Sequence, residues 1–92
     1  MKGTDFLRIL GRAFAIEIME ELSKRALRFV DLKNCCPNDR TRSLRLKELK
    51  KLGLIDVVVK DVGGRYSIHY QLTEKGRRAL KLINELRELL AE

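Results

Sequence analysis

The hydrophobic periodicity of this chain changes twice, and these changes limit the folds that its 92 residues can adopt. Up to Gly53, a residue type that often ends helices, apolar residues recur every three or four positions, as in helices that bury one face. From 55 to 72 they alternate with other residues, as in strands, and Gly63-Gly64 interrupts the alternation. From 74 onward the helical spacing returns. The sequence therefore predicts an α+β fold, mainly α with a small β-hairpin.

The first apolar segment, residues 5–23, is expected to be helical because its apolar residues recur at helical spacing. Thr4 or Asp5 can cap its start, since a short polar side chain there accepts a hydrogen bond from a free backbone amide. Gly11 can divide it into two helices, because glycine is a poor helix former. The apolar surface is wide for so short a segment, which favours burial on two sides, with a partner chain as one candidate.

Two further helices are expected next, separated by Pro37. Residues 29–35 form the short one, and its inward side chains are expected to be Phe29, Val30 and Leu32. Residues 39–52 form the longer one, which Asn38 or Asp39 can cap. Its buried face is expected to consist of Leu46, Leu49 and Leu52.

The alternating region predicts a hairpin with a glycine-rich loop. On one face of its strands lie Ile55, Val57, Val59, Tyr66, Ile68, Tyr70 and Leu72. On the other lie Asp56, Val58, Lys60, Ser67, His69 and Gln71. His69 is therefore expected to be solvated. Thr73 can cap a long last helix over residues 74–91, which spans about 27 Å at about 1.5 Å per residue.

The order of these elements is helix, short helix, turn, helix, hairpin and long helix, which is that of a winged helix-turn-helix. We expect residues 1–92 to form one such domain with long N- and C-terminal helices. The net charge is +7, and residues 37–53 alone carry six basic and two acidic residues. This concentration favours a polyanionic partner, although a charged surface can also serve solubility alone.

Three motifs resemble those of winged-helix transcription regulators. The R-F-x-[DE]-L motif of HxlR-type regulators is matched by Arg28-Phe29-Val30-Asp31-Leu32. The L-x-x-L-x-x-x-G-L-[IV] motif that closes the recognition helix in HxlR-, ArsR-, PadR- and MarR-type proteins is matched by Leu46-Lys47-Glu48-Leu49-Lys50-Lys51-Leu52-Gly53-Leu54-Ile55. The Y-x-L-T-x-K-G motif that joins wing and last helix is matched by Tyr70-Gln71-Leu72-Thr73-Glu74-Lys75-Gly76. The chain thus resembles this superfamily, and most closely the HxlR type.

The sequence also departs from these families. Phe14 stands where HxlR-type proteins usually have a tryptophan, and their N-terminal Cys-Pro is absent. The Cys-x-Cys metal box of ArsR-type sensors and their ligands on the last helix are absent as well, so the resemblance implies no metal and no other cofactor.

The resemblance implies that residues 39–52 are a recognition helix in the major groove of double-stranded DNA. The candidate contacts on its outer side are Arg40, Thr41, Ser43, Lys47 and Lys51. Arg40 suits a bidentate contact to guanine, whereas the two lysines suit phosphates. Thr41 and Ser43 suit phosphate or base contacts. Leu44 shares this side, where it can touch a thymine methyl or pack on a neighbouring element, and packing is slightly favoured. A solvated charged face is the alternative for the whole surface.

The hairpin tip, residues 60–66, is the candidate wing. Lys60 and Arg65, with Tyr66 beside them, are candidate contacts to the adjacent minor groove, and Gly63-Gly64 would allow close approach. An ordinary glycine turn with a solvent-facing arginine is the alternative.

The terminal helices, residues 5–23 and 74–91, are candidate dimerisation helices, because their apolar surface is wider than a small core needs. The candidate interface residues are Phe6, Leu7, Leu10, Leu82, Ile83, Leu86, Leu89 and Leu90. A homodimer would place two recognition helices about one DNA turn apart. Packing of the first helix on the last within one chain is the alternative.

Cys35 and Cys36 are the candidates for redox chemistry. A thiolate beside Lys33 and Arg40 could be stabilised and oxidised, whereas two small buried hydrophobic side chains are the simpler interpretation. Two cysteines and one histidine are too few for a four-ligand zinc site. No grouping of nucleophile, histidine and acid can be argued, so we expect no enzyme.

Three function classes follow. The first is a dimeric, sequence-specific DNA-binding transcription regulator. The second is a winged-helix module that binds proteins in a larger complex. The third is a redox-responsive regulator that uses Cys35 or Cys36. No apolar run reaches the about 20 residues that cross a bilayer, and no signal peptide is recognised, so a cytoplasmic location is expected. A charged fraction of 36% is also a tendency of thermophilic proteins.

Overall fold

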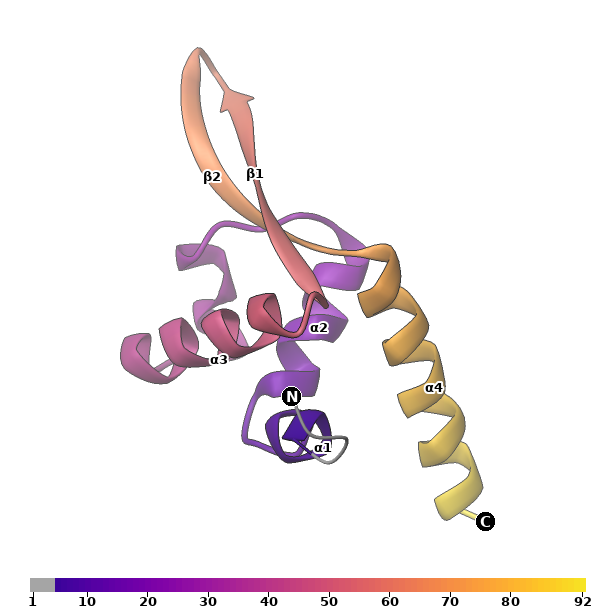
Figure 1. The fold of residues 1–92 in the computed structure, drawn as a ribbon. Helices are drawn as coiled ribbons and strands as arrows, with labels where there is room; N and C mark the ends of the chain where they lie inside the picture. The colour runs from indigo at the N-terminus through magenta and orange to yellow at the C-terminus, as the bar shows by residue number, and fades with distance from the viewer. Residues whose placement is uncertain (1–4) are drawn as a thin grey trace.

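The computed structural model describes residues 5–92, so the expected Thr4 cap lies outside the described residues. Figure 1 shows a helical body from which a hairpin and a long C-terminal helix extend in different directions. The elements are α1 (Asp5–Leu10), α2 (Ala15–Lys24), the 3₁₀ helix η1 (Val30–Asn34), α3 (Asp39–Lys51), β1 (Ile55–Val62), β2 (Arg65–Leu72) and α4 (Glu74–Leu90). No helix among residues 5–92 is long and apolar enough to cross a bilayer.

The expected helix over 5–23 is divided, as its glycine allowed. The amide of Gly11 donates to the carbonyl of Leu7 at 2.9 Å, which closes α1. Phe14 precedes α2 with a φ of 71°. This left-handed conformation is unfavourable for a bulky residue, and it redirects the chain between the two helices.

The short helix is a 3₁₀ helix, and one of its expected inward residues is wrong. Leu32 is buried and Phe29 is half-buried, but Val30 is 58% exposed. Because a 3₁₀ helix has three residues per turn, a helix of five residues presents a narrow inner face. Val30 falls outside it.

Helix α3 has the ends that its sequence predicts. The side chain of Asn38 accepts a hydrogen bond from the amide of Thr41 at 2.9 Å. Gly53 follows the helix with a φ of 77°. The inner face is buried as expected, with Leu46, Leu49 and Leu52 at 2%, 0% and 8% exposure.

The hairpin is antiparallel, and its strands reach closer to the loop than expected. Val62 pairs with Arg65 across Gly63-Gly64, and both glycines have positive φ. Two such residues suit the tight turn that matches the twist of a hairpin. Only the base enters the core: Ile55 and Leu72 are buried, whereas Val59 and Ile68, further out on the same face, are exposed.

The expectation that His69 is solvated is wrong, since it is 8% exposed. Leu27 forms an isolated antiparallel bridge with Tyr70, next to His69, so the chain before η1 runs along the edge of β2. The chain therefore lies against β2 at the base of the hairpin, where strand alternation predicted a solvated residue.

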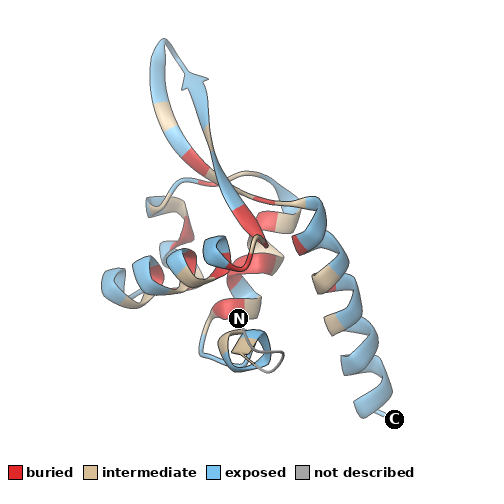
Figure 2. Cartoon of the chain, in the orientation of Figure 1, coloured by how far each residue is buried: buried red, intermediate tan, exposed pale blue. Residues whose placement is uncertain are grey.

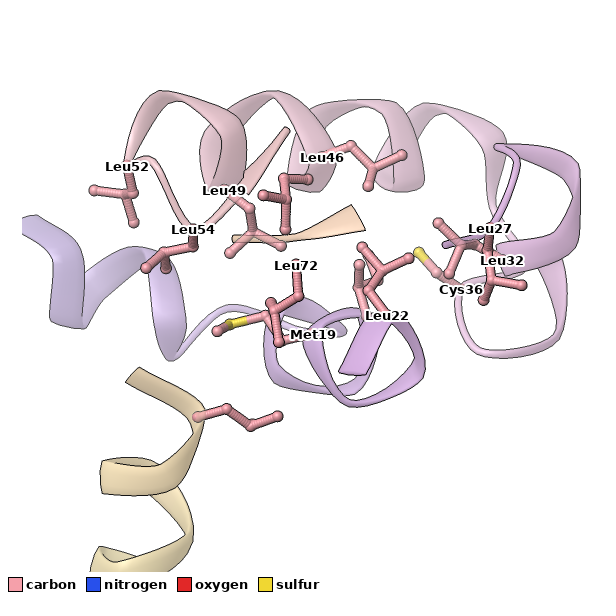
Figure 3. Packing of buried hydrophobic residues seen from close by; sticks show 13 residues of the cluster. Met19, Leu22, Leu27, Leu32, Cys36, Leu46, Leu49, Leu52, Leu54 and Leu72 are labelled. Carbon is pink, nitrogen blue, oxygen red and sulfur yellow. The ribbon is translucent and has the colours of Figure 1, made fainter. Parts of the chain in front are cut away.

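The core lies between α2, α3 and the base of the hairpin, as the buried segments in Figure 2 show. Figure 3 shows leucines of α3 facing Met19 and Leu22 of α2, with Leu54 and Leu72 between the helices. Helix α4 joins this core at its first turns only, where Gly76 and Leu80 are buried. A Cβ on Gly76 would lie 2.1 Å from the carbonyl oxygen of Leu54, so no other residue fits there without a shift of backbone.

Candidate nucleic-acid interface

The outer side of α3 carries cations that make no ion pair within residues 5–92. These exposed side chains are Arg40, Lys47, Lys50 and Lys51. The other two basic residues of 37–53 are paired, Arg42 with Asp39 and Arg45 with Glu48, each at 3.0 Å. The segment's net charge of +4 therefore resides entirely on the outer side chains. Lys50 was absent from the predicted contacts; it is exposed although it lies four residues after Leu46, at the edge of the buried face.

The predicted polar contacts of α3 differ in accessibility. Arg40 and Ser43 are exposed, whereas Thr41 is half-buried. Lys51 lies at the far end of the helix, where it also lines the groove described below. The slightly favoured packing of Leu44 is not found in the described chain, because this side chain is 48% exposed on the same surface as Arg40 and Lys47.

Side chains on the opposite side of α3 bind the chain between α1 and α2 through a hydrogen bond and an ion pair. The Nε of Arg45 donates to the carbonyl of Ala13 at 2.8 Å, and its Nη1 donates to Glu48 at 3.0 Å. Arg12 completes the cluster through an ion pair with Glu48. Helix α3 is thus held by charged contacts at its inner edge as well as by leucines.

The sequence analysis did not identify Arg42, which also holds α3 in place. Arg42 is 3% exposed and lies 4.5 Å from the ring centroid of Phe29. Its position in the sequence could have identified it, because Arg42 lies four residues before Leu46 and residues four apart share a helix face. An arginine on the core face of a helix requires a partner there.

The wing carries its charged and aromatic residues on opposite faces. Lys60 pairs with Ser67 and Val62 with Arg65, which places the two basic side chains on one face. Tyr66 pairs with Asp61 on the other face, next to Val59 and Ile68. All three predicted wing residues are exposed, but Tyr66 is not beside the two cations, because neighbouring residues of a strand point in opposite directions.

The predicted interface leucines border an apolar groove between α1 and α4, with a volume of about 710 Å³. Its apolar walls include Phe6, Leu7, Leu10, Leu82, Ile83 and Leu86. Three cations, Lys51, Lys75 and Arg78, also line it. Leu89 and Leu90 lie beyond the groove on the last turns of α4 and are 61% and 73% exposed. The two terminal helices therefore leave a continuous apolar surface uncovered within the described chain.

The two cysteines are reduced and largely enclosed. Cys36 is fully buried, and Cys35 is half-buried with its Sγ 3.3 Å from the carbonyl of Leu32. Burial raises the pKa of both thiols above the ordinary value. For Cys36, the positive charges of Arg42 and Arg45 oppose this shift in pKa without reversing it. Burial therefore does not favour the thiolate that the sequence allowed beside Lys33 and Arg40, and it agrees with the simpler interpretation of two small buried side chains.

Arg28 and Asp31, at the start of η1, form an ion pair. Arg28 donates from Nε and Nη2 to the two carboxylate oxygens of Asp31, at 3.0 and 2.9 Å, and these bonds lower the pKa of Asp31. Within residues 5–92 no three His, Cys, Asp or Glu side chains gather as metal ligands would.

A short helix, a turn and a second helix, followed by a two-stranded wing, define a winged helix-turn-helix domain. Residues 9–92 match the family model described as HxlR-like helix-turn-helix. The chain belongs to this family of transcription regulators.

Solved structures share the whole fold. The reduced form of the transcriptional regulator YodB from B. subtilis is 23% identical, with a TM-score of 0.81 over 96% of this chain and 89% of that chain. A PadR family transcription regulator from Clostridium difficile R20291 is 18% identical, with a TM-score of 0.77 over 87% and 92%. The redox regulator HypR in its reduced form is 23% identical, with a TM-score of 0.76 over 95% and 88%. No match was found among curated protein sequences.

Proposed function

We propose that the protein is a dimeric transcription regulator that binds specific sequences in double-stranded DNA, with α3 in the major groove. The observation that supports this proposal is the difference between the two sides of α3. Its inner side is fixed by leucines and by Arg42 and Arg45, while Arg40, Lys47, Lys50 and Lys51 are exposed and unpaired in the described chain. A fixed helix with free cations suits recognition, because phosphate contacts provide affinity and base contacts provide sequence preference.

The wing is assigned to the adjacent minor groove through the face that carries Lys60 and Arg65. Both side chains are exposed on a hairpin that extends beyond the helical body (Figure 1). Arginine suits a narrow minor groove, where the negative potential is enhanced. Tyr66 lies on the opposite face. Tyr66 and the two cations can therefore contact the same groove only if an edge of the hairpin, rather than one of its faces, enters it.

A second copy of the chain is the proposed occupant of the groove between α1 and α4. The charges along α4 support an antiparallel pairing of two α4 helices. Its first half carries Lys75, Arg77, Arg78 and Lys81 against Glu74 alone, and its second half carries Glu85 and Glu88 against Arg87 alone. In an antiparallel pair the basic half of one helix faces the acidic half of the other, while the leucines cover each other. A two-fold dimer would read a pseudo-palindrome. A cytoplasmic location, where the chromosome is accessible, belongs to this proposal.

The decisive experiment is selection of bound duplexes from a random pool, followed by binding measurements on the selected sequence. We expect a palindrome with half-sites about 10 base pairs apart. Replacing Arg40→Ala and Lys47→Ala together should weaken binding to the selected duplex by at least about 30-fold and reduce the salt dependence by one to two ions.

The matched control is the double variant Lys24→Ala and Arg25→Ala, which removes the same charge from exposed residues outside α3 and the wing. It should keep affinity within about threefold, since only distant charge is lost. Equal losses in the two double variants would show that binding follows net charge, and would contradict recognition by α3.

A redox-responsive regulator is the second candidate, because one of the similar structures is named as a redox regulator. The raised pKa values of Cys35 and Cys36 argue against a reactive thiolate here. We expect equal DNA affinity in reductant and after mild peroxide treatment. A change in affinity that disappears in Cys35→Ser would favour redox control. A protein-interaction module would instead show a stable protein partner and no salt-sensitive DNA binding.

A further inference from the structure

A buried arginine joins the turn of the helix-turn-helix to the start of α3. The Nε of Arg42 donates to the carbonyl of Cys36 at 2.9 Å, and Nη2 donates to the carbonyl of Pro37 at 3.2 Å. The same Nη2 lies 3.0 Å from a carboxylate oxygen of Asp39. One rigid, planar guanidinium therefore binds three residues of the turn and of the first helical turn.

An aromatic ring encloses the guanidinium. The ring of Phe29, which precedes η1, lies with its centroid 4.5 Å from the central carbon of the Arg42 guanidinium, a distance typical of cation–π contacts. Arg42 thus contacts the chain on both sides of η1. No buried side-chain nitrogen or oxygen among the described residues lacks a hydrogen-bond partner, so burial leaves no enclosed donor of Arg42 unsatisfied.

Stability of the core does not require an arginine at this position. An apolar side chain of similar length would fill the same space, and such replacements of buried ions are often neutral or stabilising. What an apolar side chain cannot do is hold the carbonyls of Cys36 and Pro37 at fixed distances from the helix. The arginine specifies one geometry of the turn.

We propose that Arg42 is a positioning residue for DNA recognition: it fixes the first turn of α3 and so sets how Arg40, Thr41 and Ser43 are presented. This inference rests on the proposed function. Successive residues of an α-helix are rotated by about 100°, so an inward side chain at 42 orients the residues on both sides of it. The N-cap Asn38 binds the amide of Thr41, and the buried leucines that fix the rest of α3 begin only at Leu46, so Arg42 is the inward contact of the first turn.

The test combines amide hydrogen exchange with DNA binding in the variants Arg42→Lys and Arg42→Met. Arg42→Lys keeps the charge and removes the planar fork, and Arg42→Met keeps the apolar stem and removes the donors. In both, the amides of residues 41 and 42 should exchange at least about 10-fold faster, while that of Leu49 changes less than about twofold. The preference for the selected duplex over a scrambled one should fall at least about 10-fold, with an unchanged salt slope in Arg42→Lys.

The control is Arg25→Lys, the same replacement at an exposed arginine, which should leave exchange and sequence preference unchanged. Wild-type exchange and preference in Arg42→Lys would overturn the inference. So would a uniform rise in exchange across α2 and α3, because that identifies a general stabilising role. If the wild-type protein shows no sequence preference, the proposed function fails. The part of this inference that concerns DNA recognition then fails as well. The exchange rates at 41 and 42 still decide whether Arg42 orders the turn.

Discussion

Helices α3 and α4 carry similar series of leucines but bury them differently. In α3, Leu46 and Leu49 are 2% and 0% exposed. In α4, Leu82, Leu86 and Leu89 are 64%, 54% and 61% exposed. Helix α3 lies across the core, whereas α4 extends away from the core after its first turns (Figure 2). A leucine pattern therefore identifies an amphipathic helix without identifying what covers it.

The largest difference between the two helices should be in folding stability. Leu49→Ala removes a fully buried side chain and should lower the free energy of unfolding by about 2–5 kcal/mol. Leu90→Ala, at a residue 73% exposed, should change it by less than about 0.5 kcal/mol in protein diluted until it is monomeric. Urea denaturation of both variants makes the comparison. Similar losses would mean that the end of α4 packs within the monomer.

The next effect concerns association. Leu86→Asp places a charge in the groove between α1 and α4, and it should weaken the dimer at least about 100-fold, or about 2.7 kcal/mol. Sedimentation velocity gives the oligomeric state, and far-UV circular dichroism checks that the monomer stays folded. Leu44→Asp is the matched control, since Leu44 is exposed on α3 outside the groove. A Leu86→Asp protein that remains dimeric would place the interface elsewhere.

Removing the N-caps of α3 and α4 should have smaller effects on folding stability. Asn38→Ala removes one hydrogen bond at the start of α3 and should cost about 1 kcal/mol of folding stability. Thr73→Ala should cost more, because the Thr73 hydroxyl accepts from the amide of Gly76 at 2.9 Å and donates to the carbonyl of Gly53 at 2.7 Å. Thermal unfolding ranks the two variants. Thr73→Ser, which keeps the hydroxyl, should behave as wild type.

The smallest effect should be a pH dependence at η1, on which α3 packs. Arg28 lowers the pKa of Asp31 in the folded protein, so this pair stabilises the fold above the unfolded pKa of about 3.9. The stabilisation is lost as the pH falls through the lower folded pKa. Arg28→Ala should therefore be less stable than wild type at pH 6, and the difference should shrink towards pH 2. A difference independent of pH would show that Arg28 acts through packing.

Much of the architecture could be predicted from local patterns. The helix caps at Asn38 and Thr73, the helix end at Gly53 and the turn at Gly63-Gly64 all lie where the sequence places them. Such features depend on a few neighbouring residues and on backbone conformations that glycine and short polar side chains favour. The inner leucines of α3 were predicted for the same reason, since helical spacing alone puts them on one face.

The burial of particular side chains could not be predicted in the same way. Val30 was expected inside and is exposed, whereas His69 was expected outside and is buried. Strand alternation assigns faces but does not predict that the chain around Leu27 pairs with β2 next to His69. Arg42 was overlooked because its charge suggests solvent, and only the path of the turn brings two carbonyls and the ring of Phe29 to it.

The sequence by itself determined the order of the elements, the boundaries at its glycines and the concentration of positive charge in residues 37–53, because each depends on local conformation or composition. The tertiary structure decided how that charge is used. Arg42 and Arg45 are turned inward, where carbonyls and carboxylates compensate them, and Arg40, Lys47, Lys50 and Lys51 are left outside. Burying a cation is favourable only where partners are already in place, and the fold determines where those places are.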